Sequence, residues 1–75
     1  MTNYTFGTAL TSLNLGLKCQ RASKLKDNPN SYYIIEDNEL YLLYPAHLEN
    51  TYNRVEVGSL SKDDLLADDW VIIKD

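Results

Sequence analysis

Ser61-Lys62-Asp63-Asp64-Leu65-Leu66-Ala67-Asp68-Asp69-Trp70 is the stretch that decides how this chain folds at its C-terminal end. Ser61 precedes the carboxylate of Asp64 by three residues, which is the spacing of a capping pair at a helix start. One short helical turn is therefore predicted, with Leu65 and Leu66 on its buried side. The aromatic and β-branched residues that follow predict a final strand, whose tryptophan anchors the edge of the core.

The first third of the chain predicts a helix, a strand and a loop. Thr5 is placed to cap the helix, and Gly16 is placed as a left-handed stop just past its last turn. Residues 17–21 alternate between apolar and polar and predict a short strand, whereas residues 22–31 have turn chemistry and predict a polar loop. The apolar stripe of the helix consists of Phe6, Ala9, Leu10, Leu13 and Leu17.

The middle of the chain predicts a β-hairpin. Residues 32–36 and 39–44 are rich in tyrosine and branched aliphatic residues, as strands are. Asp37-Asn38 lies between them, and two residues of this type favour a tight hairpin turn. Pro45 is expected to end the second strand, and residues 46–51 to form a loop or a single helical turn.

One more strand completes the predicted fold. Residues 52–57 alternate, with Val55 and Val57 on one face. The whole of residues 1–75 is therefore expected to form a single α+β domain. In it, one N-terminal helix packs on a small antiparallel sheet of about five strands, with a short helical turn before the last strand.

Small size limits the stability of this domain. A chain of 75 residues buries only about 60–65% of the surface that its unfolded form exposes. Cys19 is the one cysteine and His47 the one histidine, so neither an internal disulfide nor a zinc pattern is available. Self-association is the remaining remedy that we expect, and no metal or cofactor is predicted. A lone thiol, no apolar run of membrane-spanning length and no signal-peptide pattern favour the cytoplasm.

Charge is distributed unevenly along the chain. Residues 1–26 contain no acidic residue, whereas residues 27–75 hold all eleven. The net charge of −4 disfavours binding to DNA or RNA. A small anion would still be attracted if the fold gathered the N-terminal cations in one cleft; alternatively, these cations only solvate one strand and one loop. The cations in question are Lys18, Arg21, Lys24 and Lys26.

Two patterns, one from each end of the chain, can be compared with known families. The N-terminal pattern is Phe6, Ala9-Leu10, Leu13, Gly16, Lys18 and Arg21, and the C-terminal pattern is Asp64-Leu65-Leu66-Ala67-Asp68-Asp69-Trp70. Together they resemble the small phage proteins of the type-two Thoeris anti-defence family. The similarity covers nearly the whole chain, although the middle hairpin matches only in character. The C-terminal motif is the more specific of the two.

The resemblance implies a phage protein that sequesters a signal without cleaving it. The signal is glycocyclic ADP-ribose, which bacterial TIR-domain immune enzymes make, and the protein would act in the cytoplasm of the infected cell. The resemblance also implies a homotetramer with ligand pockets between subunits. Some relatives are implied to hold cyclic oligonucleotide signals at a second type of site.

The chain departs from this family at one position. The family commonly has a tryptophan three residues after the arginine, and here Lys24 stands three residues after Arg21. A phosphate contact from Lys24 is one replacement for the stacking contact of a tryptophan. One of the six tyrosines is the next candidate for stacking on a base.

A site for cyclic ADP-ribose needs donors for a pyrophosphate, an acceptor for ribose hydroxyls and a flat ring for the base. The planar fork of Arg21 suits the pyrophosphate, and the alternative for Arg21 is an ion pair with one of the many acids. Asp64 suits the ribose hydroxyls, and its alternative is the capping pair with Ser61. The helical turn after Ser61 also has N–H groups that can meet an anion.

Two aromatic residues complete the candidate set. Phe6 lies on the helix stripe and belongs either to the site or to the core. Tyr41 and Tyr44 are three residues apart and so face opposite sides of their strand, one packing inward and the other stacking on ligand or lining an interface. The candidate ligand-binding residues are Phe6, Arg21, Lys24, Tyr41, Ser61 and Asp64.

Catalysis has little support in the sequence. No general base stands beside a nucleophile at a recognised spacing, and Cys19 is interpreted as a small core residue. The chain is therefore not expected to be an enzyme. The main alternative to the sequestering function is a small acidic module that binds and inhibits a host protein through its tyrosines. A sponge for cyclic oligonucleotides and a small hydrolase of such signals are two further alternatives.

Overall fold

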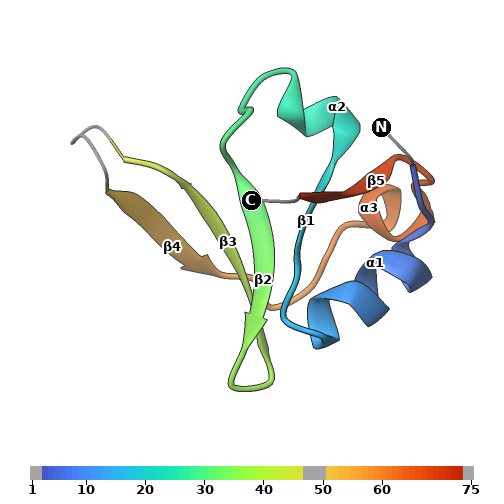
Figure 1. The fold of residues 1–75 in the computed structure, drawn as a ribbon, viewed down its shortest axis with the longest axis horizontal. Coiled ribbons are helices and arrows are strands. Elements are labelled where there is room, and N and C mark those ends of the chain that lie inside the picture. Colours follow the sequence, from blue (N-terminus) through green and yellow to red (C-terminus); the bar gives the residue numbers. More distant parts are fainter. Residues whose placement is uncertain (1–2, 47–50, 74–75) are drawn as a thin grey trace.

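The protein is an α+β domain, as the sequence predicts. A computed structural model describes residues 3–46 and 51–73, so His47 and most of the predicted 46–51 loop lie outside the described residues. Figure 1 shows the arrangement of the elements. The helices are α1 (Phe6–Asn14), α2 (Ala22–Leu25) and α3 (Lys62–Leu66), and the strands are β1 (Lys18–Arg21), β2 (Tyr32–Glu36), β3 (Glu39–Pro45), β4 (Tyr52–Glu56) and β5 (Trp70–Ile73).

The five strands form one antiparallel sheet in the order β4-β3-β2-β1-β5. The first strand of the chain therefore lies between the hairpin and the last strand. In the β1–β5 ladder, Lys18 pairs with Ile73 and Arg21 pairs with Trp70. This register brings the end of β1 beside the C-terminal motif. A further bridge joins Tyr4 to Trp70 on the outer side of β5.

The hairpin turn forms as predicted. Asp37 and Asn38 have φ of 54° and 65°, both in the left-handed region. Two successive positive φ values are typical of a type I′ turn, whose twist matches that of the flanking strands. The strands β2 and β3 pair without interruption from Tyr32–Leu43 to Glu36–Glu39.

The core lies between α1 and the sheet, centred on Trp70. This side chain is fully buried, and its ring centroid lies 5.4 Å from that of Phe6 and 5.6 Å from that of Tyr33. Cys19 is also fully buried, and burial raises the pKa of its thiol to about 11. The predictions that Trp70 anchors the core and that Cys19 is a core residue are confirmed.

The predicted burial of the α3 leucines is wrong. Leu65 is 47% and Leu66 74% exposed, whereas Asp64 is the buried residue of α3. The reason is that the indole N–H of Trp70 donates to the backbone carbonyl of Asp64 over 2.9 Å. Together with the ion pairs of the Asp64 carboxylate to Arg21 and Lys24, this bond places the polar start of the short helix inward and its two leucines outward.

The stripe of α1 and the region after β1 also differ from expectation. The buried residues of α1 are Ala9, Ser12 and Leu13, while Leu10 and Leu17 are exposed. Thr5 occupies the N-cap position of α1 but makes no side-chain capping bond.

The polar loop predicted for residues 22–31 begins as a single helical turn, α2, rather than as irregular chain. Val55 of the edge strand β4 is exposed, whereas Val57, just after this strand, is partly buried against the core.

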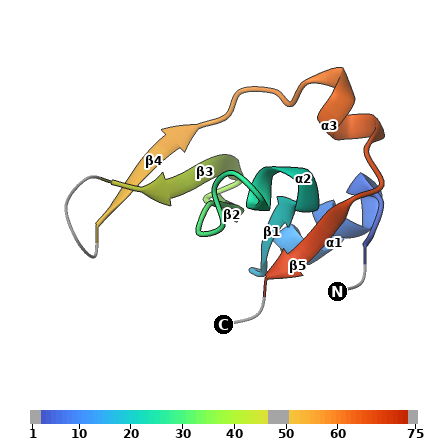
Figure 2. The same cartoon turned by 90° about the horizontal axis from the view of Figure 1, so that it is seen from above.

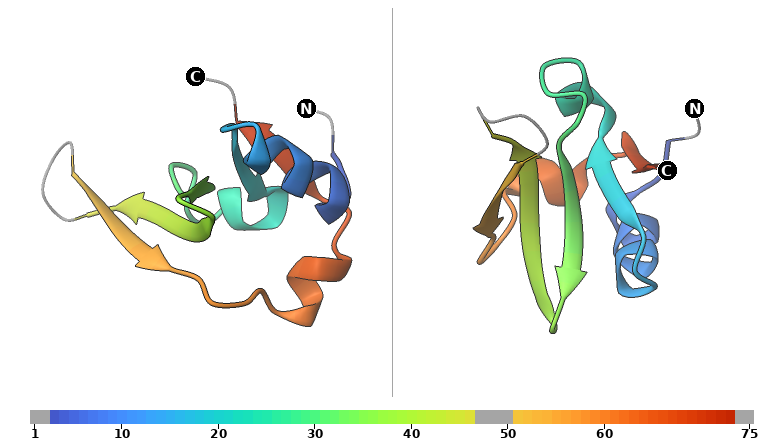
Figure 3. Two further views of the ribbon diagram at one scale, coloured as in Figure 1. Left: turned by 90° about the horizontal axis from the view of Figure 1, so that it is seen from below. Right: turned by 60° about the vertical axis from the view of Figure 1, so that its left-hand side comes forward.

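The linker of residues 57–61 carries the chain from the far edge of the sheet back to β5. Figure 2 shows this linker and α3 running past the hairpin strands, and Figure 3 shows α1 on β1 and β5. Val57 and Leu60 in the linker pack against the core. Within the described ranges, no helix has the length and apolar character that crossing a membrane requires.

Gly16 provides a test of the left-handed stop that follows α1. Its φ is +89°, and a Cβ added there would meet nothing within 4 Å. We expect Gly16→Ala to lower the free energy of unfolding by about 1–2 kcal/mol, because only backbone strain is added. Urea denaturation measures the change. Gly58→Ala is the matched control, since Gly58 has equal space and a φ outside the left-handed region; equal effects in the two variants would contradict the prediction.

Candidate functional site

Arg21 lies at the centre of a polar cluster formed by β1, α2, α3 and the segment before β5. Its Nε donates to Oδ1 of Asp69 over 2.8 Å, and its Nη1 donates to Oδ1 of Asp64 over 2.9 Å. The pairing of Arg21 with Trp70 explains this geometry, because it places the guanidinium beside the residues that precede the tryptophan. Of the two alternatives for Arg21, the structure shows the ion pair with acids, and an anion would have to compete with both carboxylates.

Lys24 reaches the same carboxylate from α2. Its Nζ lies 3.3 Å from the carboxylate oxygens of Asp64 and donates to the hydroxyl of Tyr33 over 3.2 Å. The ammonium also lies 5.7 Å from the centroid of the Tyr33 ring. The side chain of Lys24 remains 40% exposed, so an anion from solvent can reach it.

Ser61 caps α3 as predicted. The backbone N–H of Asp64 donates to Oγ of Ser61 over 3.3 Å, and the Ser61 hydroxyl lies 3.1 Å from Oδ2 of Asp64. Asp64 therefore interacts with Arg21, Lys24 and Ser61 at once. These partners explain how a carboxylate can be buried without a large energetic penalty.

Asp69 attaches α2 to the sheet. Its Oδ2 accepts from the backbone N–H of Ser23 over 3.1 Å, and its backbone carbonyl accepts from the N–H of Ala22 over 2.8 Å. Asp69 is absent from the predicted site because acids before a strand are commonly solvated. The sequence signal that could have revealed it is its position next to Trp70, the partner of Arg21.

The cluster keeps its four charges at neutral pH. Burial acts to raise the pKa of Asp64, but hydrogen bonds from Arg21, Ser61 and Lys24 outweigh it and lower this pKa below the ordinary value. The pKa of Asp69 is lowered in the same way, since the hydrogen bonds from Arg21 and Ser23 outweigh burial. Burial acts to lower the pKa of Lys24, but its bonds to Tyr33 and Asp64 raise it overall.

Among the N-terminal cations, Arg21 and Lys24 converge and Lys18 does not. Arg21 and Lys24 share Asp64, whereas Lys18 lies with its Nζ 4.8 Å from the ring centroid of Tyr32. Because Tyr32 precedes Tyr33 in β2, its side chain points to the face opposite α1. The attraction for an anion therefore comes from two cations that two carboxylates balance, rather than from a group of four.

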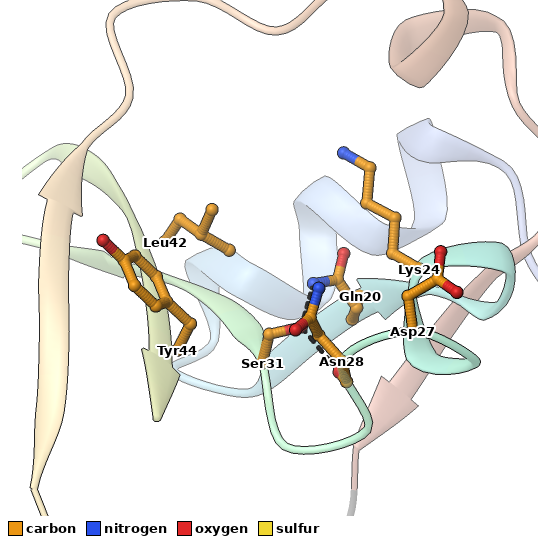
Figure 4. Close-up of a pocket in the computed structure, with 7 residues that line it drawn as sticks. All are labelled: Gln20, Lys24, Asp27, Asn28, Ser31, Leu42 and Tyr44. Atoms are coloured by element: carbon orange, nitrogen blue, oxygen red, sulfur yellow. Dashed lines mark hydrogen bonds between the residues drawn. The ribbon is translucent and has the colours of Figure 1, made fainter. Parts of the chain in front are cut away.

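A hollow of about 200 Å³ adjoins the cluster at Lys24. Figure 4 shows Leu42 and Tyr44 on one side of it and Lys24 and Asp27 on the other. Of the six predicted site residues, Lys24 is the one that lines it. The lining residues are Gln20, Lys24, Asp27, Asn28, Ser31, Leu42 and Tyr44.

The structure brings neither of the two predicted aromatic residues, Phe6 and Tyr41, to this cluster or to the hollow, so these two site predictions are wrong. Phe6 packs its ring on Trp70 in the core. Tyr41 lies on the other face of the sheet, where its hydroxyl donates to Oε2 of Glu39 over 3.0 Å and the guanidinium carbon of Arg54 lies 3.8 Å from its ring centroid. A second hollow of about 320 Å³ near this hairpin includes Glu39 and Glu56 in its lining, so its charge disfavours an anion.

The chain was compared with family models, with curated proteins and with solved structures. No family model matches it, and neither a curated protein nor a solved structure shows a significant match.

Acid sensitivity provides a test of the cluster. The lowered pKa values of Asp64 and Asp69 stabilise the fold above the unfolded pKa of about 3.9, and this contribution is lost as the pH falls through the lower folded-state values. We expect Asp64→Asn to lower the free energy of unfolding by about 1–3 kcal/mol at pH 7 and to make it fall less steeply below pH 4. Urea midpoints measured from pH 2 to 7 give both quantities.

The control for this experiment is Asp68→Asn, which changes an exposed carboxylate in the same segment. Its stability profile should follow that of the wild type. A pH profile of Asp64→Asn that matches the wild type would show that the buried carboxylate is not the acid-sensitive group.

Proposed function

We propose that this protein is a non-enzymatic phage protein that binds and sequesters glycocyclic ADP-ribose in the cytoplasm of the infected cell, thereby inhibiting Thoeris-type immunity. The observation that carries the proposal is the convergence of Arg21, Lys24 and Ser61 on Asp64, with Lys24 also lining a hollow. These four residues come from segments about 40 positions apart. They combine donors for phosphate with an acceptor for hydroxyls.

Lys24 is the residue that links the cluster to the hollow. Asp64 and Tyr33 hold its ammonium group in place, and Lys24 is also one of the residues that line the hollow. A fixed ammonium group loses little conformational freedom when a phosphate arrives, which favours tight binding. In the proposed complex the pyrophosphate contacts Lys24, and Arg21 adds a second donor from the same cluster.

The size of the hollow supports a site shared between subunits. Its volume of about 200 Å³ lies below the roughly 300–1,000 Å³ of sites that enclose a ligand of drug size. One subunit therefore supplies only part of the walls. Exposed leucines on α3 and after α1 offer apolar surface for association: Leu15 is 76%, Leu65 47% and Leu66 74% exposed. In the proposal the protein is a homo-oligomer, and the family resemblance implies a tetramer.

Sequestration also fits the chemistry of the cluster. The two carboxylates are engaged by cations and have lowered pKa values, whereas a general acid at neutral pH needs a raised one. Cys19 is buried with a raised pKa and is unsuited to be a nucleophile. The exposed Leu15, Leu65 and Leu66 also favour a second candidate function, a module that binds and inhibits a host protein directly.

Ligand binding by matched lysine variants tests the proposal. We expect isothermal titration of the wild type with glycocyclic ADP-ribose to show binding, and Lys24→Gln to weaken it at least tenfold because a charge-assisted contact is lost. Lys26→Gln is the control, since Lys26 is exposed and does not line the hollow. Equal affinities of the two variants would contradict the role of Lys24.

Heating the complex separates the remaining alternatives. Intact ligand in the released fraction supports sequestration, and a cleaved product would show a hydrolase. A thermal-shift panel that responds to cyclic dinucleotides but not to cyclic ADP-ribose isomers would favour the oligonucleotide sponge. Silence across the panel would favour the protein-binding module.

A further inference from the structure

We propose that the hollow beside Lys24 binds the amino-bearing purine base of the ligand, with Tyr44 as its stacking surface. This inference rests on the proposed function for the identity of the whole ligand. The volume of about 200 Å³ suits one ring system rather than a complete dinucleotide. The base therefore enters the hollow while the phosphates remain at its edge, next to the ammonium group of Lys24.

Tyr44 is distinguished from the other tyrosines of the sheet by what covers its ring. Tyr33 packs against Trp70 and lies under Lys24, Tyr32 and Tyr52 lie against each other at 5.8 Å, and Tyr41 lies under Arg54. In residues 3–46 and 51–73, no ring contact involves Tyr44. It is 37% exposed and lines the hollow, so its ring is available to a base.

The floor of the hollow is fixed before any ligand arrives. Nε2 of the buried Gln20 donates to Oγ of Ser31 over 2.9 Å, and the Ser31 hydroxyl donates to the backbone carbonyl of Asn28 over 2.8 Å. Oε1 of Gln20 accepts from the backbone N–H of Arg21 over 2.9 Å. This chain of bonds holds the 26–31 loop against β1, so binding a base requires little ordering.

The two ends of the hollow differ in chemistry. Leu42 and Tyr44 are two residues apart in β3 and present an apolar and an aromatic surface on the same side of the strand. Lys24 and Asp27 lie on the opposite side (Figure 4). In the proposed complex the Asp27 carboxylate faces the C6 substituent of the base, where it accepts from the exocyclic amine of adenine and repels the carbonyl oxygen of hypoxanthine.

With Tyr44 as the stacking surface, position 24 of α2 does not need an aromatic side chain and can hold a lysine. A flat ring in the site comes from β3, at Tyr44, rather than from α2. Lys24 then directs its charge toward the phosphates. The aromatic and cationic contacts of the site are thus supplied by two different elements, with the hollow between them.

The test uses AMP and IMP as probes of the full chain, because they differ in the exocyclic amine. We expect titration followed by amide NMR to show AMP shifting the resonances of the 26–31 loop and binding about tenfold more tightly than IMP. Tyr44→Leu should weaken AMP about tenfold, the range seen for loss of base stacking. Tyr52→Leu is the matched control, an exposed tyrosine on the neighbouring strand that does not line the hollow.

Asp27→Asn is the second variant, and it removes no core contact because Asp27 is exposed. It should reduce the preference for AMP over IMP while the protein stays folded. AMP shifts confined to other parts of the molecule, or equal AMP affinity in Tyr44→Leu and Tyr52→Leu, would overturn the base site.

The two proposals can fail separately. Tight binding of glycocyclic ADP-ribose that Tyr44→Leu leaves unchanged would remove the base site and keep the proposed function. AMP binding that depends on Tyr44, without any binding of glycocyclic ADP-ribose, would keep the base site and remove the proposed function.

Discussion

The buried carboxylate of Asp64 is the constraint on which the rest of the structure depends. Its side chain joins Arg21 of β1 to Lys24 of α2, and its backbone carbonyl accepts from the indole of Trp70. A buried charge is tolerated only when it is paired and hydrogen-bonded. Two regions about 40 residues apart in the chain, β1–α2 and α3–β5, must therefore assemble together, and this requirement fixes the orientation of α3 as well as the position of the candidate site. In a domain with so small a core, such a cluster contributes specificity as well as stability.

The same cluster limits what the site can bind. Two cations near two carboxylates give little net charge, so long-range attraction of an anion is weak and affinity must come from fixed geometry. The side chain of Lys24 meets this need, because it is held by Asp64 and Tyr33 and still exposed at the edge of the hollow. In the proposed function, such preorganisation would favour tight binding of the signal.

Local patterns in the sequence succeed where short-range physics decides. The Asp37-Asn38 turn, the Gly16 stop and the Ser61 cap all form as predicted, because each depends on one or two residues and their backbone angles. The burial of Leu65 and Leu66 is wrong for the opposite reason. A helix of five residues has too few turns to define an apolar face, so the tertiary contacts of Asp64 with Arg21, Lys24 and Trp70 determine which side turns inward. In the same way, Arg21 could be assigned to phosphate or to an acid only once its strand partner was known.

By itself, the sequence determined the α+β class, the antiparallel hairpin, the core tryptophan and the identity of four polar residues that meet in space. The fold features follow from periodicity, turn chemistry and capping, all of which act over a few residues, whereas the polar residues follow from the family resemblance and the groups that a pyrophosphate ligand needs. Only the tertiary structure decided that Asp69 joins the cluster, that Tyr41 lies on the far face and that Tyr44 borders a hollow. The physical reason is the register of β1 with β5 and of β2 with β3. Pairing between distant strands sets which side chains become neighbours, and no local pattern specifies that pairing.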